Sequence, residues 1–194
     1  MRQEKKKRGK LVVISGPSGV GKSTICKELV KRMADVYLSI SVTTRPKSDS
    51  EVDGKDYWFI SKDEFQRRID EGLLLEYAEV FGNMYGTPKD KVDEALETGK
   101  TVLLEIDVQG ARQVKALYPD AEMIFILPPS STVLADRMNG RGRDSAEVAA
   151  KRLDGAGMEI AAGLQYYTHM VINDDLEQAV QECVAIIEDA RGRS

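Results

Sequence analysis

A glycine-rich segment close to the start of the chain constrains the possible fold more than any other feature of the sequence. It runs Gly16-Pro17-Ser18-Gly19-Val20-Gly21-Lys22-Ser23 and fits the pattern G-x-x-x-x-G-K-[S/T] at every fixed position. The apolar run Leu11–Ser15 before it is typical of a buried strand, and a helical pattern follows from about Lys22 to Met33. A strand, this loop and a helix in succession predict a phosphate-binding loop, and an accidental glycine-rich turn is the weaker alternative.

The residue types in this loop indicate a nucleoside triphosphate as its ligand. Glycines let the backbone wrap closely around a phosphate, and successive N–H groups at a helix N-terminus bind anions. Lys22 is expected to reach the β- and γ-phosphates, and the Ser23 hydroxyl is expected to bind Mg²⁺. Every residue of the segment is therefore a predicted nucleotide contact: Gly16, Pro17, Ser18, Gly19, Val20, Gly21, Lys22 and Ser23.

Apolar runs alternate with helical patterns along the rest of the chain, which predicts a parallel α/β sheet covered by helices. Further strands are expected at Tyr37–Val42, Tyr57–Ile60, Thr101–Val108, Met123–Leu127 and His169–Ile172. Further helices are expected from the capping box at Ser61 to about Gly72, from Thr87-Pro88 to Gly99, at Asp144–Met158 and at Asp175–Ala190. In the second of these helices, a threonine is the expected cap and a proline the first helical residue.

Length and composition exclude several classes of protein. The chain of 194 residues suits one globular unit, and its net charge of −4 offers no field that would recruit nucleic acid or an anionic membrane. Cys26 and Cys183 are far apart and lie in helical patterns, so we interpret them as buried thiols of a reducing compartment. The basic residues 1–10 are expected to form a flexible tail rather than a nucleic-acid arm, and the apolar run behind them is too short for export. The expected location is the cytoplasm.

Two acids end one of the expected interior strands. Glu105 and Asp107 are two residues apart, so their side chains point to the same side of that strand. Ligands of open α/β sheets bind beyond the carboxyl ends of the strands, and both acids should therefore approach the nucleotide. Such acids hold Mg²⁺, directly or through water, or bind a polar substrate. The alternative is that one of them only caps a helix.

Three further features indicate a kinase that holds a second anionic substrate. Arg45 is followed by a proline and surrounded by hydroxyls, which suits bidentate binding of a phosphate. Glu76 lies among apolar neighbours and is suited to accept two N–H bonds from one edge of guanine. Arg137, Arg141 and Arg152 bracket a glycine-interrupted segment, as expected of a mobile lid. Taken singly, these residues have simpler explanations as a solvated turn, a surface acid and a charged helix face.

From Leu11 to about Ala190, the chain resembles guanylate kinases. The stretches that carry the resemblance are Val13–Thr24, Ser39–Arg45, Glu51–Tyr57, Asn83–Thr87, Glu105–Gly110 and Val171–Asp174. The resemblance implies a P-loop NTPase fold of three α/β/α layers with a parallel central sheet, a small GMP-binding lobe and a lid. The implied ranges are 11–38, 88–127 and 156–194 for the core, 39–87 for the lobe and 128–155 for the lid.

The resemblance also implies a reaction, ATP + GMP ⇌ ADP + GDP with Mg²⁺, and roles for individual residues. Guanine is expected against Ser41, Glu76, Thr87 and Asp107, and the GMP phosphate against Arg45, Tyr57 and Tyr85. Thr24 and Asn173 join the ATP site, Ser23 and Glu105 form the metal site, and the catalytic residues are Lys22, Arg137, Arg141 and Arg152. Of the two roles open to Thr87, helix cap and guanine contact, the second is favoured.

One position departs from the family pattern. Guanylate kinases usually carry a second phosphate-binding arginine three residues after the first, and that position here is Ser48. Lys47 or Lys55 compensates in part as a point charge, although neither offers the planar fork of arginine. We therefore expect weaker GMP binding than in relatives that have the arginine.

Other functions remain as alternatives. A kinase of a phosphorylated sugar is disfavoured by Ser41, Glu76 and Thr87, which together suit the edge of guanine. A non-catalytic scaffold that binds phosphorylated peptides is disfavoured by the intact Lys22 and Ser23. A nucleic-acid-binding ATPase would need a basic face that the composition does not provide. The sequence does not decide between a monomer and a homo-oligomer.

Overall fold

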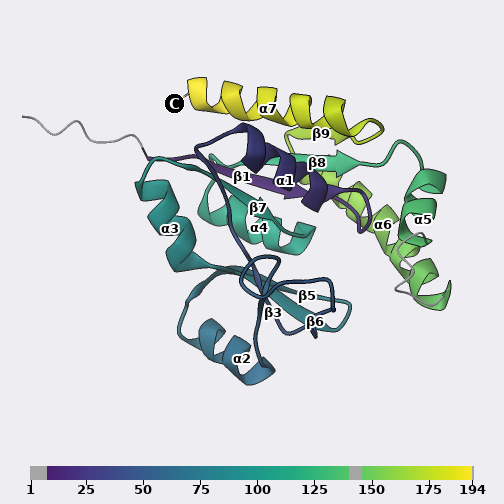
Figure 1. Cartoon of the computed structure of the whole chain (residues 1–194), viewed down its shortest axis with the longest axis horizontal. Coiled ribbons are helices and arrows are strands. Elements are labelled where there is room, and N and C mark those ends of the chain that lie inside the picture. The colour runs from purple at the N-terminus through teal and green to yellow at the C-terminus, as the bar shows by residue number, and fades with distance from the viewer. Residues whose placement is uncertain (1–7, 140–145, 194) are drawn as a thin grey trace, which may run out of the picture.

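A parallel sheet of five strands lies at the centre of the molecule, with strand order β2-β7-β1-β8-β9 (Figure 1). The computed structural model describes residues 8–139 and 146–193, except for the side chains of residues 139 and 146–154. The strands of the sheet are β1 (Leu11–Ser15), β2 (Val36–Leu38), β7 (Thr101–Glu105), β8 (Glu122–Leu127) and β9 (His169–Ile172). The expected parallel α/β sheet is confirmed.

Helices cover both faces of the central sheet because side chains alternate along each buried strand. Val12 and Ile14 of β1 pack in the core under α1 and α7, whereas Leu11 and Val13 pack in the core under α3, α4 and α6 (Figure 1). The fold therefore has the predicted three layers. The bounds of these helices are α1 Lys22–Arg32, α3 Lys89–Glu97, α4 Val108–Leu117, α6 Ala146–Tyr166 and α7 Leu176–Gly192.

A second, smaller sheet lies beside the carboxyl ends of the central strands (Figure 1). Its strand order is β4-β3-β6-β5, with β3 (Val42–Thr43), β4 (Trp58–Phe59), β5 (Leu74–Val80) and β6 (Asn83–Pro88). Helix α2 (Lys62–Asp70) packs on this sheet through the buried Phe65. Its predicted start is confirmed, since the Ser61 side chain accepts a hydrogen bond from the N–H of Glu64 at 3.1 Å.

Two predictions about strands were wrong. The expected strand Tyr37–Val42 is divided between the two sheets, because β2 ends at Leu38 and β3 begins at Val42. The residues between them cross from one sheet to the other and line the cavity described below. The expected strand Thr101–Val108 ends at Glu105, and Asp107 caps α4 by accepting a hydrogen bond from the N–H of Gly110 at 3.0 Å.

Two helix boundaries also differ from the predictions. Thr87 does not cap α3, since the N-cap is Pro88 and helix α3 begins at Lys89. Thr87 belongs instead to β6, where strand pairing places it opposite Glu76. Helix α6 continues to Tyr166, beyond the expected end at 158, because its packing on α4 and β8 supports the additional turns. Helix α5 (Ser131–Asn139) precedes residues 140–145, which lie outside the described residues.

The β5–β6 hairpin had no counterpart among the expected strands. Its two-residue turn consists of Phe81 and Gly82, which have φ values of 49° and 77°. Positive φ at both positions is typical of the type I′ turn that joins tightly paired strands. Among the helices of the described residues, none combines the length and apolar character needed to cross a bilayer.

The hairpin turn and helix α6 predict opposite effects of the same substitution. Nothing lies within 4 Å of a Cβ added at Gly82 or at Gly157, so backbone conformation decides both outcomes. Gly82→Ala should lower the free energy of unfolding by about 1 kcal/mol because alanine disfavours positive φ. Gly157→Ala, on an exposed position of α6, should raise it by about 0.5–1 kcal/mol. Urea unfolding of both variants measures this, and changes of equal sign would contradict the assignment of the turn.

Candidate functional site

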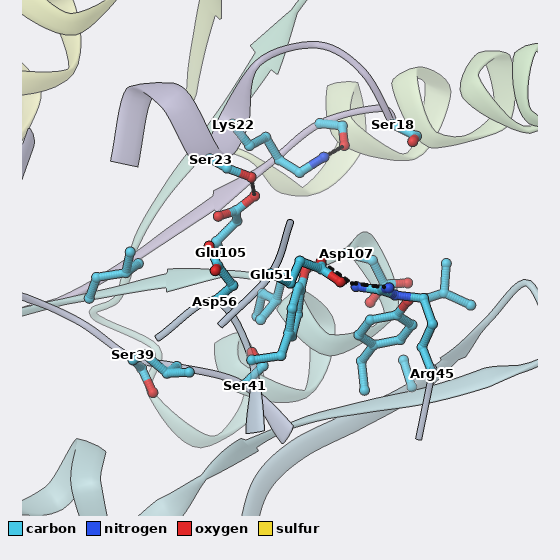
Figure 2. Close-up of a pocket in the computed structure, with 18 of the residues that line it drawn as sticks. Ser18, Lys22, Ser23, Ser39, Ser41, Arg45, Glu51, Asp56, Glu105 and Asp107 are labelled. Atoms are coloured by element: carbon cyan, nitrogen blue, oxygen red, sulfur yellow. Dashed lines mark hydrogen bonds and ion pairs between the residues drawn. The ribbon is translucent and has the colours of Figure 1, made fainter. Parts of the chain in front are cut away.

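A cavity of about 570 Å³ lies between the phosphate loop and the smaller sheet. Figure 2 shows Lys22 and Ser23 of the loop on one side, with Ser41 and Arg45 on the other. The loop follows β1, the central strand of the parallel sheet, and Glu105 ends the neighbouring strand β7. This is the edge where open α/β sheets bind their ligands.

The loop has a backbone conformation that requires glycine. Gly16, Gly19 and Gly21 have φ values of 150°, 83° and 104°. A Cβ on Gly21 would collide with the side-chain nitrogen of Asn173, and one on Gly16 would collide with the carbonyl oxygen of Ile126. The fixed glycines of the motif are therefore explained both by dihedral angle and by close packing.

The Lys22 and Ser23 side chains extend from the first turn of α1 into this region (Figure 2). The Lys22 ammonium donates hydrogen bonds to the carbonyl oxygens of Gly16 at 2.5 Å and Pro17 at 3.1 Å. The Ser23 hydroxyl donates to Glu105 Oε1 at 2.6 Å. A hydroxyl and a carboxylate in contact supply the hard oxygen ligands that Mg²⁺ prefers, so these two residues fit such an ion.

Glu76 is a buried carboxylate on the opposite side of the cavity. Its side chain is 3% exposed, and Oε1 accepts a hydrogen bond from the Thr87 hydroxyl at 2.5 Å. Burial raises the pKa of Glu76 to about 7, the hydrogen bond from Thr87 opposes this shift, and the nearby Asp107 carboxylate adds to it. The other oxygen of Glu76 lies against Gly110 of α4, where a Cβ would collide with it.

Arg45 forms an ion pair within the smaller lobe, by which we mean the smaller sheet with its connecting segments (Figure 2). Its guanidinium donates two hydrogen bonds to Glu51, at 3.0 and 2.6 Å, and lies 5.4 Å from the centre of the Tyr57 ring. The Ser48 hydroxyl and N–H also donate to Glu51, at 2.7 and 2.9 Å. The hydrogen bonds from Arg45 and then Ser48 lower the pKa of Glu51 to about 2, and the pair raises the pKa of Arg45.

Comparisons with known proteins agree with this arrangement. The family model described as Guanylate kinase matches residues 8–190. The chain is 51% identical to a guanylate kinase of Synechocystis sp., and the aligned region covers 93% of this chain and 94% of the relative. It is 49% identical to one of Carboxydothermus hydrogenoformans, covering 93% and 88%. The crystal structure of guanylate kinase from Anaplasma phagocytophilum matches with a TM-score of 0.80 and 34% identity, covering 95% of this chain and 87% of that one. The chain belongs to the guanylate kinase family.

Most of the residues predicted for a guanylate kinase site line one cavity. They come from the loop, the smaller lobe and the end of β7: Gly16, Ser18, Gly19, Gly21, Lys22, Ser23, Ser41, Arg45, Tyr57, Glu76, Tyr85, Glu105 and Asp107. Their roles towards ligands stay predictions. Thr87 is fully buried behind Glu76, which it contacts.

Two other predicted site residues, Asn173 and Arg137, support the loop. The Asn173 side chain donates to the carbonyl oxygen of Val20 at 2.8 Å, and the carbonyl oxygen of Asn173 accepts from Arg137 at 3.0 Å. Asn173 is buried, and the contacts of both residues in this structure are to backbone near the loop. Arg141 lies outside the described residues, and so does the side chain of Arg152.

Three acids that line the cavity, Glu51, Asp56 and Glu159, were absent from the predicted site. Glu51 lies six residues after Arg45 and begins the stretch Glu51–Tyr57 that carries the family resemblance, but no role was predicted for it. Glu159 extends from α6, and burial raises the pKa of its carboxyl. No local pattern in the sequence reveals that this position of α6 faces the cavity.

The raised pKa of Glu76 predicts how stability depends on pH. The folded state holds this proton more tightly than the unfolded chain, so the stabilisation is complete below about pH 4.5 and is lost as pH rises through about 7. Glu76→Gln removes the titration and keeps an acceptor for Thr87. Relative to the variant, the natural chain should lose up to about 3 kcal/mol of unfolding free energy between pH 5 and 8.

Urea titrations at several pH values measure this difference. Glu79→Gln is the matched control, because Glu79 is exposed on the same strand. A difference between Glu76→Gln and the natural chain that stays constant over this pH range would show that the Glu76 carboxylate is not destabilised by burial.

Proposed function

We propose that this chain transfers the γ-phosphoryl group of ATP to GMP, and that the cavity beside the phosphate loop holds both nucleotides. The observation that carries this proposal is a buried carboxylate, Glu76, in the cavity that the phosphate loop also lines. Guanine presents two adjacent N–H donors on one edge, which a carboxylate accepts in a bidentate manner. The family membership supports the same reaction.

The donor side of the reaction is assigned to the loop. The glycine backbone and the N-terminus of α1 suit the phosphates of ATP, and Lys22 exchanges its carbonyl contacts for phosphate oxygens. Ser23 and Glu105 would hold Mg²⁺, which neutralises phosphate charge when it is bound. Thr24 and Asn173 are assigned to the ATP site next to them, with Asn173 acting through the loop carbonyl that it holds.

The acceptor side is assigned to the smaller lobe. Glu76 accepts from guanine, with Ser41 beside it in the cavity, and Thr87 orients Glu76 through its hydroxyl. Asp107 adds a second carboxylate near the same edge. The phosphate of GMP replaces Glu51 on Arg45, and the nearby hydroxyls of Tyr57 and Tyr85 donate to it. Burial raises the pKa of Tyr57 and so keeps its hydroxyl a donor.

The transfer itself needs positioning more than proton transfer. A phosphate oxygen of GMP is already the nucleophile, so the reaction proceeds in line without a general base. Lys22 stabilises the charge of the transferred group, and Arg137, Arg141 and Arg152 are assigned to the same task. We assign residues 39–87 to the lobe and 128–155 to the lid, whose closure excludes water.

The setting of the reaction is also part of the proposal. Cys26 and Cys183 are buried free thiols, which suits the reducing cytoplasm. The substrates are two small nucleotides, and neither nucleic acid nor a membrane is required. The reaction itself runs in a monomer or in each subunit of a homo-oligomer.

A panel of acceptors tests the proposal. ADP formation from ATP and Mg²⁺ is measured with AMP, GMP, CMP, UMP and no acceptor in parallel. We expect turnover with GMP, and Glu76→Ala should lose base selectivity while the KM for ATP changes little. A protein that binds ATP but leaves GMP unphosphorylated would contradict the function and favour the non-catalytic scaffold.

Ser48 predicts an improvement of the acceptor site. Its side chain and N–H bind Glu51, and an arginine at this position could pair with Glu51 and also reach the phosphate. A charge-assisted hydrogen bond contributes about 1.5–3 kcal/mol. Ser48→Arg should therefore lower the KM for GMP by about tenfold or more, since about 1.4 kcal/mol corresponds to a factor of ten.

Initial rates over a range of GMP concentrations measure the effect. Ser50→Arg is the matched control, because it adds the same charge at an exposed position two residues away. An unchanged or higher KM in Ser48→Arg would show that the missing arginine does not weaken GMP binding.

A further inference from the structure

Helix α4 carries two glutamines that contact the backbone of strand β5. Gln109 and Gln113 are four residues apart, so their side chains extend from the same face of the helix. Strand β5 is an edge strand of the smaller sheet, paired only with β6 among the described strands. The glutamines meet its other edge, where they link the core to the lobe.

The contacts resemble those of an additional strand. Gln113 donates to the carbonyl oxygen of Tyr77 at 2.7 Å and accepts from the N–H of Tyr77 at 3.3 Å. Gln109 donates to the carbonyl oxygen of Glu79 at 3.1 Å and to Asp107 Oδ2 at 3.0 Å. The side-chain amides thus form hydrogen bonds with backbone N–H and carbonyl groups of β5 on the edge that is not paired with β6.

The alternation of β5 connects this edge to the cavity. Glu76 and Ala78 are buried and line the cavity, whereas Tyr77 and Glu79 are exposed. Gln113 binds both the N–H and the carbonyl oxygen of Tyr77, and Tyr77 is the direct neighbour of Glu76. A shift of Tyr77 along or away from α4 moves the buried carboxylate with it.

Helix α4 also contacts Glu76 directly between the two glutamines. Gly110 leaves the space that Glu76 Oε2 occupies, and Asp107 at the start of the helix acts on the pKa of the same carboxyl. The distance between α4 and β5 therefore sets both the packing and the electrostatic environment of Glu76.

We propose that Gln113, assisted by Gln109, is a positioning residue for purine selection. By binding the backbone of Tyr77, Gln113 fixes the register in which Glu76 faces both the cavity and Asp107. This inference rests on the proposed function, because it assumes that Glu76 binds the base of the acceptor.

Gln113→Glu is the most direct test. The carboxylate keeps the acceptor for the Tyr77 N–H but loses the donor and faces the Tyr77 carbonyl oxygen. We expect the KM for GMP to rise about tenfold, the energetic equivalent of one lost hydrogen bond of about 1.4 kcal/mol. The KM for ATP and kcat at saturating GMP should stay within about twofold, a range of about 0.4 kcal/mol.

The preference between two bases distinguishes a positioning role from a loss of stability, because a loss of stability alone would not change that preference. IMP lacks the amino group of guanine, so the preference for GMP over IMP in kcat/KM should fall in Gln113→Glu. Gln113→Met removes both hydrogen bonds without adding charge and should show the same direction, which covers the case in which Gln113→Glu fails to fold. Gln181→Glu makes the same chemical change on the exposed face of α7 and should leave all four quantities unchanged.

The outcomes separate this inference from the function on which it rests. If the natural chain phosphorylates GMP and both Gln113 variants keep its KM and its preference over IMP, the positioning role is wrong while the function holds. If the natural chain does not phosphorylate GMP, the function fails, and the role assigned to Gln113 fails with it.

Discussion

The shape of the phosphate loop is fixed by contacts that the core makes with it. Gly16 and Gly21 lie so close to Ile126 and Asn173 that a side chain at either position would collide with them. Asn173 also holds the Val20 carbonyl, and Arg137 holds the Asn173 carbonyl. The loop is thereby tied to the ends of β8 and β9, so its anion-binding geometry follows from the packing of the central sheet.

The smaller lobe depends on this core through helix α4. Asp107 begins the helix, Gly110 makes room for the Glu76 carboxylate, and Gln113 holds the adjacent backbone of β5. One helix of the core thus determines where the buried Glu76 carboxylate lies. The proposed donor and acceptor sites consequently contact the same core, although their residues come from distant parts of the chain.

Sequence predictions were most accurate where the residues involved are contiguous in the chain. The phosphate loop was predicted residue by residue because its motif is contiguous, and Glu76 was suggested by its apolar neighbours. The strand expected at Tyr37–Val42 was wrong because periodicity indicates burial but not which sheet a residue joins. Glu51 and Gln113 act through partners brought near them by loop conformation and lobe docking, and no local pattern specifies these contacts.

Arg45 and Glu76, the two proposed acceptor contacts, differ in the partners that they have within the protein, and this difference bears on the proposed selectivity. Arg45 is already satisfied by Glu51, so a phosphate must displace a carboxylate of similar geometry and gains little from charge alone. Glu76 is buried with a raised pKa, so its ionised form lacks sufficient stabilisation until donors reach it. Guanine supplies such donors, whereas a phosphorylated molecule without them does not. We therefore propose that discrimination between acceptors arises at the base, and that the phosphate contact mainly orients the nucleophile.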